Sequence, residues 1–415
     1  MKKNLLLLAV SVVLSYVFLE FAVWRNLLDR VPLTLHTELG RLQYLAQTSK
    51  KGIVPRDYML IVGDSYAEGL GDWLLEVIRD GNPDHNAAHV IHRRTGRDVL
   101  SFGFRGGYPG WTYTFQLTEA FHGLRQYAFM DVPQPTDVLA YFYAGNDFND
   151  EMTGIRYWLP KELDRTRLSD AAYVDDYMAG LGRNGEWAAE RRWHVLRNAP
   201  LFDTATKLVK LAWRNLHRKM PFFASSDRAF QTVNAYRPDW SRYAGSAVSF
   251  ATKDGPKPYP PETIEPFAFH TPAEIEQAGL FFGEALRFVG GRFPKARLWV
   301  VFIPTPIDAY RIVEDGVFLR DRIMTADAEK AGPPTYFTKA ALAAAADRMC
   351  RSVLASGQAV GARFIDPRPH LRQRSYEAGY LHGPNDAAHF NRQGYTALAE
   401  AIIDGMARGG DPACR

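Results

Sequence analysis

Five short apolar runs recur along the chain, and none alternates between hydrophobic and polar positions. The runs span residues 58–62, 99–103, 138–145, 298–303 and 362–365. They are rich in β-branched and aromatic residues, which is typical of strands buried on both faces of a sheet. Helical patterns lie between them, for example at 274–289 and 338–356. This alternation predicts an α/β fold in which a parallel, doubly wound sheet of five strands lies between helices.

A longer apolar run opens the chain. Residues 5–24 contain a single charged residue, Glu20, and about 20 such positions cross a bilayer core of ~30 Å. Trp24 and Arg25 follow where a cleavage site needs small residues, so an uncleaved anchor is favoured over a cleaved signal peptide. Lys2 and Lys3 predict a cytoplasmic amino terminus. We expect a transmembrane segment within residues 1–25, a connector over 26–55, and the rest of the chain in the periplasm or outside the cell.

Composition narrows the class of protein. The chain has 415 residues, of which 47% are hydrophobic and 23% charged, so it is neither disordered, collagen-like nor a polytopic membrane protein. A net charge of +4 is too small and too spread to predict binding to nucleic acid. Two cysteines, Cys350 and Cys414, exclude a disulfide framework and a zinc finger. A single bridge between them in an oxidising compartment stays open.

Reactive groups gather where the predicted strands end. Ser65 follows the first strand, the glycine turn 103–107 the second and Asn146 the third, while Asp386 and His389 come after the fifth. Ligand sites in doubly wound sheets form at the carboxyl ends of the strands. We therefore expect these groups to meet at one edge of the sheet.

The chemistry that these groups predict is acyl transfer. A serine needs an adjacent base, usually a histidine whose second nitrogen is fixed by a carboxylate. Asp386 and His389 are three residues apart, so one tight turn can join them and leave the imidazole to accept the proton of Ser65. The oxyanion can be bound by the Ser65 N–H, an N–H of the turn 103–107 and the Asn146 amide. The non-catalytic alternatives are a helix N-cap for Ser65 and a turn role for Asn146.

Four sequence blocks carry a resemblance to a known family. They are Gly63-Asp64-Ser65, the glycine turn 103–107, Gly145-Asn146-Asp147 and Asp386-x-x-His389. Together they resemble, in order, the four blocks of the SGNH (GDSL) hydrolase superfamily, over residues 56–150 and 290–408. Ser101 departs from the family, which usually has asparagine there.

The resemblance implies a fold and a set of roles. The fold is a flavodoxin-like three-layer sandwich. Ser65 would be the nucleophile, His389 the base and Asp386 its orienting partner. Ser65, Gly106 and Asn146 would supply the oxyanion donors. No cofactor or metal ion is implied.

The sequence around these blocks, at 63–69 and 389–395, is similar to membrane-anchored bacterial members linked to surface-polysaccharide acylation, among them relatives of the alginate O-acetyltransferases. The resemblance implies a bacterial inner-membrane protein with partners in polysaccharide biosynthesis. Its substrate would be an ester or an acylated saccharide. The favoured activity is ester hydrolysis through an acyl-enzyme. An O-acetyltransferase acting on an extracytoplasmic polysaccharide is the alternative, and a non-catalytic polysaccharide-binding or assembly module is the third.

Residues 151–271 show no pattern of buried strands. We interpret them as a largely helical insertion, a lid or accessory region, between two parts of the hydrolase domain at 56–150 and 272–408. Basic residues concentrate at 191–219, where a solvated face, a wall attracting an anionic polymer and contact with lipid head groups stay open. Residues 253–261 predict a stiff, extended loop.

Three histidines, His85, His89 and His92, share a spacing that would place them on one helix face. Surface or packing roles are favoured over a metal site there, because no carboxylate completes a ligand set.

Overall fold

A computed structural model describes most of the chain. The described residues are 2–24, 49–51, 55–72, 86–104, 106–127, 132–158, 164–192, 201, 205–206, 209, 213, 239–259, 268–324, 329–384 and 386–415.

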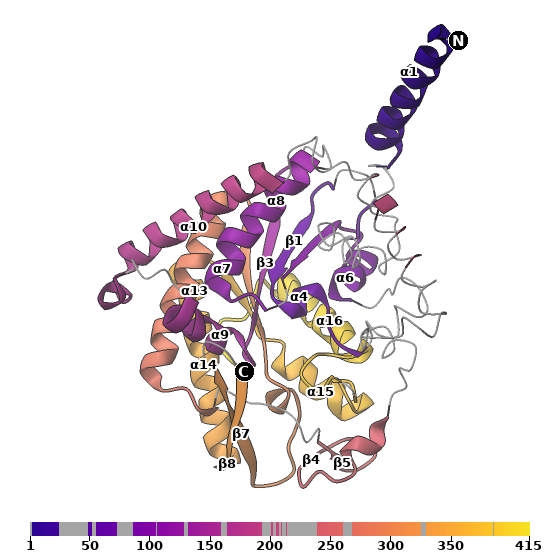
Figure 1. Ribbon diagram of the computed structural model, residues 1–415. Helices are drawn as coiled ribbons and strands as arrows, with labels where there is room; N and C mark the ends of the chain where they lie inside the picture. Colours follow the sequence, from indigo (N-terminus) through magenta and orange to yellow (C-terminus); the bar gives the residue numbers. More distant parts are fainter. Residues whose placement is uncertain are drawn as a thin grey trace.

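One parallel sheet of five strands forms the centre of the protein (Figure 1). The strands are β1 (Met59–Gly63), β2 (Val99–Gly103), β3 (Asp137–Tyr143), β6 (Arg297–Ile303) and β9 (Arg363–Ile365). Their order is β2-β1-β3-β6-β9, and every neighbouring pair is parallel. The five predicted strands are therefore confirmed, and β1, β2 and β3 are buried along their whole length. Because the chain runs from β1 outward to β2 and then back to β3, the strand order reverses between β1 and β3, and such a reversal leaves a crevice at the carboxyl ends.

Helices cover both faces of the sheet (Figure 1). They are α6 (Ala87–Thr95), α8 (Leu117–Tyr127), α10 (Ala171–Arg192), α13 (Pro272–Arg292), α14 (Lys339–Ala359), α15 (Arg368–Ala378) and α16 (Arg392–Arg408). On one face α8 packs on α10, α10 on α13 and α13 on α14. On the other face α16 packs on α6 and α15. The α/β architecture with helices on both faces is thus confirmed.

Side-chain caps set where the two predicted helices begin. The Thr271 hydroxyl accepts the Glu274 N–H, and the Glu274 carboxylate accepts the Thr271 N–H at 2.9 Å, so a complete capping box starts α13. Thr338 caps α14 by accepting the Ala341 N–H at 3.2 Å. Both helices match the sequence prediction because their signals are local: a cap, good helix formers and an apolar face.

The amino-terminal run forms a helix, α1 (Lys2–Phe18), which continues as the π-helical segment η1 (Leu19–Trp24). By length and composition, Lys3–Val23 can cross a membrane. Its apolar side chains face outward; Leu5, for example, is 71% exposed. Its one carboxylate, that of Glu20, is buried and accepts hydrogen bonds from the Tyr16 hydroxyl and the Leu201 N–H, each at 3.0 Å.

The predicted insertion has one large helix in its described part. Helix α10 packs between α8 and α13, so it belongs to a helical layer of the sheet. The short segments are η5 (Gly154–Trp158), η6 (Arg165–Arg167), η8 (Trp240–Tyr243), β4 (Ser249–Phe250) and β5 (Lys257–Pro258). The predicted extended loop at 253–261 contains β5, which pairs with β4. Most of the basic stretch 191–219 lies outside the described residues.

Besides β4 and β5, the structure has a second antiparallel hairpin, which the sequence pattern did not predict. Strands β7 (Gly316–Met324) and β8 (Glu329–Thr338) pair in antiparallel register, with an irregularity between Arg320 and Arg322. Pro333 and Pro334 interrupt any strand signal in β8, since proline cannot donate to a ladder.

The two cysteines meet. Cys350 on α14 and Cys414 near the carboxyl end form a disulfide that closes a separation of 64 residues. The same tail is also held by a hydrogen bond from the Arg415 N–H to Asp366 at 2.7 Å.

Removing this disulfide is expected to lower the free energy of unfolding by about 2–4 kcal/mol, because the unfolded chain regains the entropy of an open loop. The change is Cys350→Ser with Cys414→Ser, and the measurement is urea unfolding of the detergent-solubilised protein. Reduced wild type serves as the control and should show the same shift. A difference below about 0.5 kcal/mol between oxidised wild type and the double variant would contradict this role of the disulfide.

Candidate active site

Ser65 lies at the sheet edge where β1 ends. It is the first residue of the short helix α4 (Ser65–Glu68), and its side chain is buried. The N-cap is Asp64, whose Oδ1 accepts the Tyr66 N–H at 2.9 Å. The alternative that Ser65 serves as an N-cap is therefore wrong, because the neighbouring aspartate has that role. The hydroxyl of Ser65 instead lies 2.9 Å from His389 Nε2 and 3.2 Å from Asp64 Oδ2.

Asp386 and His389 are joined by the tight turn that their spacing predicted. Asp386 Oδ1 accepts the N–H groups of Ala388 and His389 at 3.2 and 3.1 Å, which closes the turn. Asp386 Oδ2 lies 2.8 Å from His389 Nδ1. An ionised carboxylate only accepts hydrogen bonds, so Nδ1 carries the hydrogen and Nε2 of the neutral ring is left as the acceptor that faces Ser65.

The electrostatics favour this arrangement. Burial raises the pKa of Asp386, but the hydrogen bond and charge of His389, with the N–H groups of the turn, outweigh burial and lower the pKa below its usual range. Asp386 is therefore ionised at neutral pH. Its charge stabilises a protonated imidazole at His389, which is the state that forms when a histidine takes a proton from a serine.

Asn146 lies at the sheet edge next to Asp64, the residue before Ser65. It follows β3 at the N-cap position of α9 (Asp147–Thr153), yet its side chain makes no capping bond. Burial raises the pKa of Asp64. The hydrogen bonds that this carboxyl accepts from Tyr66, Ser65 and the Asn146 amide lower the pKa, but by less. The Asn146 side chain thus points at the carboxyl of Asp64, the residue before Ser65. Its Oδ1 is buried without a hydrogen-bond partner among the described residues.

The glycine turn after β2 brings Gly106 to the surface. Gly106 has φ of 71°, a left-handed conformation that favours glycine, and a Cβ at this position would meet nothing within 4 Å. Backbone conformation, and not crowding, therefore calls for glycine here. The Gly107 N–H donates to the Phe104 carbonyl at 3.1 Å and is used by the turn. Among the described residues, the Gly106 N–H has no hydrogen bond of this kind.

The aspartates that flank the blocks hold the backbone. Asp147 Oδ2 accepts the Tyr143 N–H at 2.8 Å, and burial raises the pKa of Asp147 well above its usual range. Behind it, Glu151 accepts the Gly110 N–H at 2.8 Å, and burial raises the pKa of Glu151 to about 8. Sequence reasoning passed over Glu151, because an acidic residue in the first turns of a helix normally indicates a solvated helix start.

Ser101, where the resemblance departs from its family, has a structural role. Its hydroxyl is buried and donates to the Ala67 carbonyl at 2.7 Å, which fastens α4 to β2. The departure lies outside the serine–histidine contact.

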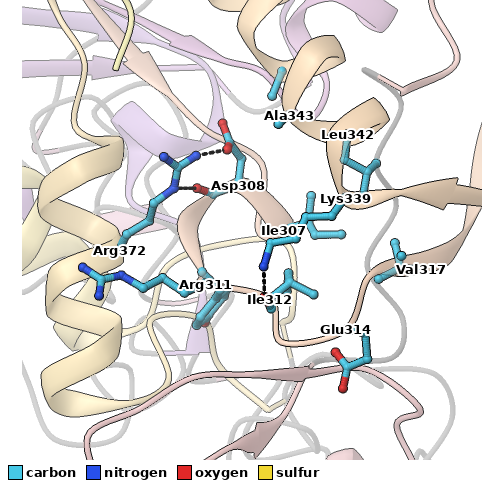
Figure 2. Close-up of a pocket in the computed structure, with 13 residues that line it drawn as sticks. Ile307, Asp308, Arg311, Ile312, Glu314, Val317, Lys339, Leu342, Ala343 and Arg372 are labelled. Carbon is cyan, nitrogen blue, oxygen red and sulfur yellow. Dashed lines mark hydrogen bonds and ion pairs between the residues drawn. The ribbon is translucent and has the colours of Figure 1, made fainter.

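A cavity of about 410 Å³ lies apart from this site, between the 3₁₀ turn η10 (Ile307–Ala309), β7 and α14 (Figure 2). Its charged groups have partners in the protein: Arg372 Nε donates to the Asp308 carbonyl at 2.9 Å, Lys339 Nζ donates to the Ile312 carbonyl at 2.7 Å, and Arg311 donates to Gln373 at 3.0 Å. None of the residues predicted for the site lines this cavity.

Two of the three histidines weighed as a metal site, His89 and His92, lie on α6, and each bonds a group of the protein. His89 Nδ1 bonds the Ser49 hydroxyl, and His92 Nδ1 bonds the Arg97 carbonyl at 2.7 Å. His85 lies outside the described residues, and α6 begins at Ala87, after it. Within the described ranges, Cys350, Asp366 and Cys414 also lie close enough to share a metal ion, but the two sulfurs are bonded to each other.

Comparison of the chain with protein-family models, with curated proteins and with solved structures found no match. Membership of the SGNH superfamily stays a prediction.

Proposed function

We propose that the protein is a membrane-anchored serine hydrolase that cleaves O-acyl esters through an acyl-enzyme on Ser65. One observation carries the proposal: a continuous chain of contacts runs from Ser65 Oγ to His389 Nε2 at 2.9 Å and from His389 Nδ1 to Asp386 at 2.8 Å. Ser65 and His389 are 324 positions apart in the sequence. Local structure alone would not bring together a serine, an imidazole and a carboxylate in the order that nucleophilic catalysis needs.

The reaction follows from the roles of these atoms. Ser65 Oγ attacks the ester carbonyl carbon while His389 Nε2 takes its proton. The N–H groups of Ser65 and Gly106 and the Asn146 amide stabilise the oxyanion. Collapse of the tetrahedral intermediate breaks the C–O bond, and His389 returns the proton to the departing alcohol. Water then attacks the acyl-enzyme with the same imidazole as base, which releases the carboxylic acid and restores the Ser65 hydroxyl.

Solvent access favours hydrolysis as the fate of the acyl-enzyme. The side chains of His389 and Asp386 are 18% and 30% exposed, so water reaches the base. An acceptor hydroxyl in place of water would make the same intermediate an O-acetyltransferase, and excluding water is what separates the two activities.

We place the domain outside the cytoplasm, tethered to a bacterial inner membrane by α1. Two features support this placement. Helix α1 and η1 form an apolar segment long enough to cross a bilayer, and the disulfide between Cys350 and Cys414 is a bond that persists in oxidising compartments.

A fluorophosphonate probe tests the proposed function, because it phosphonylates serines that have an activated hydroxyl. The full chain in detergent is expected to be labelled at Ser65, identified by peptide mass, and to hydrolyse p-nitrophenyl acetate. With an oligosaccharide present, acetylated sugar that forms faster than free acetate would identify a transferase. A well-folded sample that is neither labelled nor active would contradict the proposal and favour a non-catalytic module.

A further inference from the structure

Two tyrosine hydroxyls converge on the carbonyl oxygen that precedes the histidine. Tyr66 Oη donates to Ala388 O at 2.6 Å, and Tyr143 Oη donates to the same oxygen at 3.1 Å. Tyr66 directly follows Ser65, and Tyr143 is the last residue of β3, three positions before Asn146. A single carbonyl oxygen therefore connects the segments that carry the serine, the asparagine and the imidazole.

We propose that Tyr66 and Tyr143 are positioning residues, which hold the His389 loop against Ser65 through the Ala388 carbonyl. The inference rests on the proposed function. The pair of hydroxyls with their shared acceptor is called the tyrosine clamp below.

The clamp acts at the middle of the loop, whereas most of the loop's other described hydrogen bonds lie at its ends. Its two ends are closed by a bridge between His382 and Phe390 and by a hydrogen bond from the Asn391 N–H to the Leu381 carbonyl at 2.8 Å. Near its start, the Gly383 carbonyl accepts the hydroxyl of Tyr243. The Asp386 turn is internal to the loop and does not fix it to the sheet. Among the described contacts, the clamp, the packing of Phe390 on Tyr66 and the serine–histidine contact join the loop to the segments beside Ser65.

Both clamp rings are held firmly. Tyr66 is 1% exposed and Tyr143 is 4% exposed, and their ring centroids are 4.3 Å apart. The Tyr66 ring also lies 5.3 Å from the imidazole of His389. Burial raises the pKa of Tyr66 well above its ordinary value, so this hydroxyl keeps its hydrogen at every pH used to assay esters. The packing fixes two rigid donors at the sheet edge.

The sequence makes room for the clamp at Gly145. A Cβ at this position would lie 2.2 Å from Cζ and 2.3 Å from the hydroxyl oxygen of Tyr143, so any larger residue would displace the ring. The glycine before Asn146 thus has a physical reason: it leaves room for the Tyr143 ring, whose hydroxyl reaches the Ala388 carbonyl.

Loss of the hydroxyls is expected to slow the chemistry without weakening substrate binding. Phenylalanine keeps the ring packing, and neither hydroxyl is needed to contact the ester. An imidazole displaced by a fraction of an ångström accepts the serine proton less well, which lowers kcat and leaves KM in place.

The test compares Tyr66→Phe, Tyr143→Phe and the double variant with Tyr58→Phe. Tyr58 is a matched control, since it is fully buried and its hydroxyl also donates to a carbonyl, that of Pro133 at 2.8 Å, at the opposite end of β1. The double variant is expected to lose roughly 10- to 100-fold in kcat for p-nitrophenyl acetate with KM within about twofold. Tyr58→Phe should keep both constants. An unchanged kcat in a folded double variant would overturn the proposal, and the single variants decide the matter if the double variant does not fold.

Hydrogen–deuterium exchange separates the clamp from the proposed function. The segment 381–391 is expected to exchange faster in the double variant than in wild type, while Tyr58→Phe leaves its rate unchanged. Unaltered exchange would overturn the clamp whatever the activity. If wild type neither hydrolyses esters nor reacts with a fluorophosphonate, yet exchange accelerates in the double variant, then the loop contact holds and the hydrolase assignment fails.

Discussion

Replacing Ser65 with alanine is expected to lower kcat for p-nitrophenyl acetate by about 10,000-fold or more, because no other group in the site can form the acyl-enzyme. The same change should abolish labelling by a fluorophosphonate. The fold should survive, since the cap of α4 belongs to Asp64 and the serine hydroxyl holds no backbone group among the described contacts. Initial rates and the melting temperature of the detergent-solubilised chain check both statements.

Ser101→Ala is the matched control for this change. Ser101 is also a buried serine, on β2, but its hydroxyl donates to the Ala67 carbonyl. We expect this variant to lose some stability and to keep wild-type kcat. A Ser65→Ala protein that retains more than about a tenth of the activity would remove Ser65 from the role of nucleophile.

The parts of the fold that the sequence predicted are those with local signals. Continuous apolar runs indicated all five strands, because a strand buried on both faces needs hydrophobic residues at every position. The helical patterns at 274–289 and 338–356 indicated α13 and α14, and the caps at Thr271 and Thr338 that begin these helices are local features too. The meeting of Ser65 and Asn146 at one edge followed from strand polarity, since parallel strands place all their carboxyl ends together. His389 lies beyond α15, which follows β9, so strand polarity alone does not place it.

The features that escaped prediction depend on contacts between distant residues. Nothing near residues 171–192 shows that α10 would pack on α8 and α13, because a partner helix leaves no mark on the sequence beyond an apolar face. The disulfide joins two cysteines that are 64 residues apart in the sequence, and this separation does not indicate how close they lie in space. In the sequence, Tyr66 and Tyr143 cannot be distinguished from ordinary aromatic residues of a hydrophobic core. Their common acceptor, Ala388, has no side-chain chemistry to indicate it.

The orienting carboxylate offers the sharpest test of how the site works. Asp386→Asn is expected to lower kcat by roughly 100- to 10,000-fold, because an amide can donate as well as accept and no longer forces the hydrogen onto His389 Nδ1. A ring with its hydrogen on Nε2 cannot accept the proton of Ser65. Affinity for the ester should change little, so the loss should appear in kcat. A variant with kcat within about threefold of wild type would show that Asp386 does not orient the imidazole.

The charge of Asp386 also predicts the direction in which the pH dependence of the activity should change in this variant. A carboxylate favours the protonated imidazole, so removing its charge makes His389 easier to deprotonate, and the acid limb of kcat/KM should move to lower pH in Asp386→Asn. Stability should follow from the lowered pKa of Asp386: its contribution is present above the pKa of an unfolded aspartate and is lost as pH falls through the folded value. The difference in stability between wild type and variant should therefore close in acid.

Asp98→Asn is the control for the acid limb of kcat/KM. The Asp98 carboxylate accepts the Lys51 and Arg56 N–H groups at 2.9 and 3.1 Å, before β2, and its loss should leave the acid limb where it is. An acid limb that stays in place in Asp386→Asn while kcat falls would show that the carboxylate orients the ring without stabilising its charge.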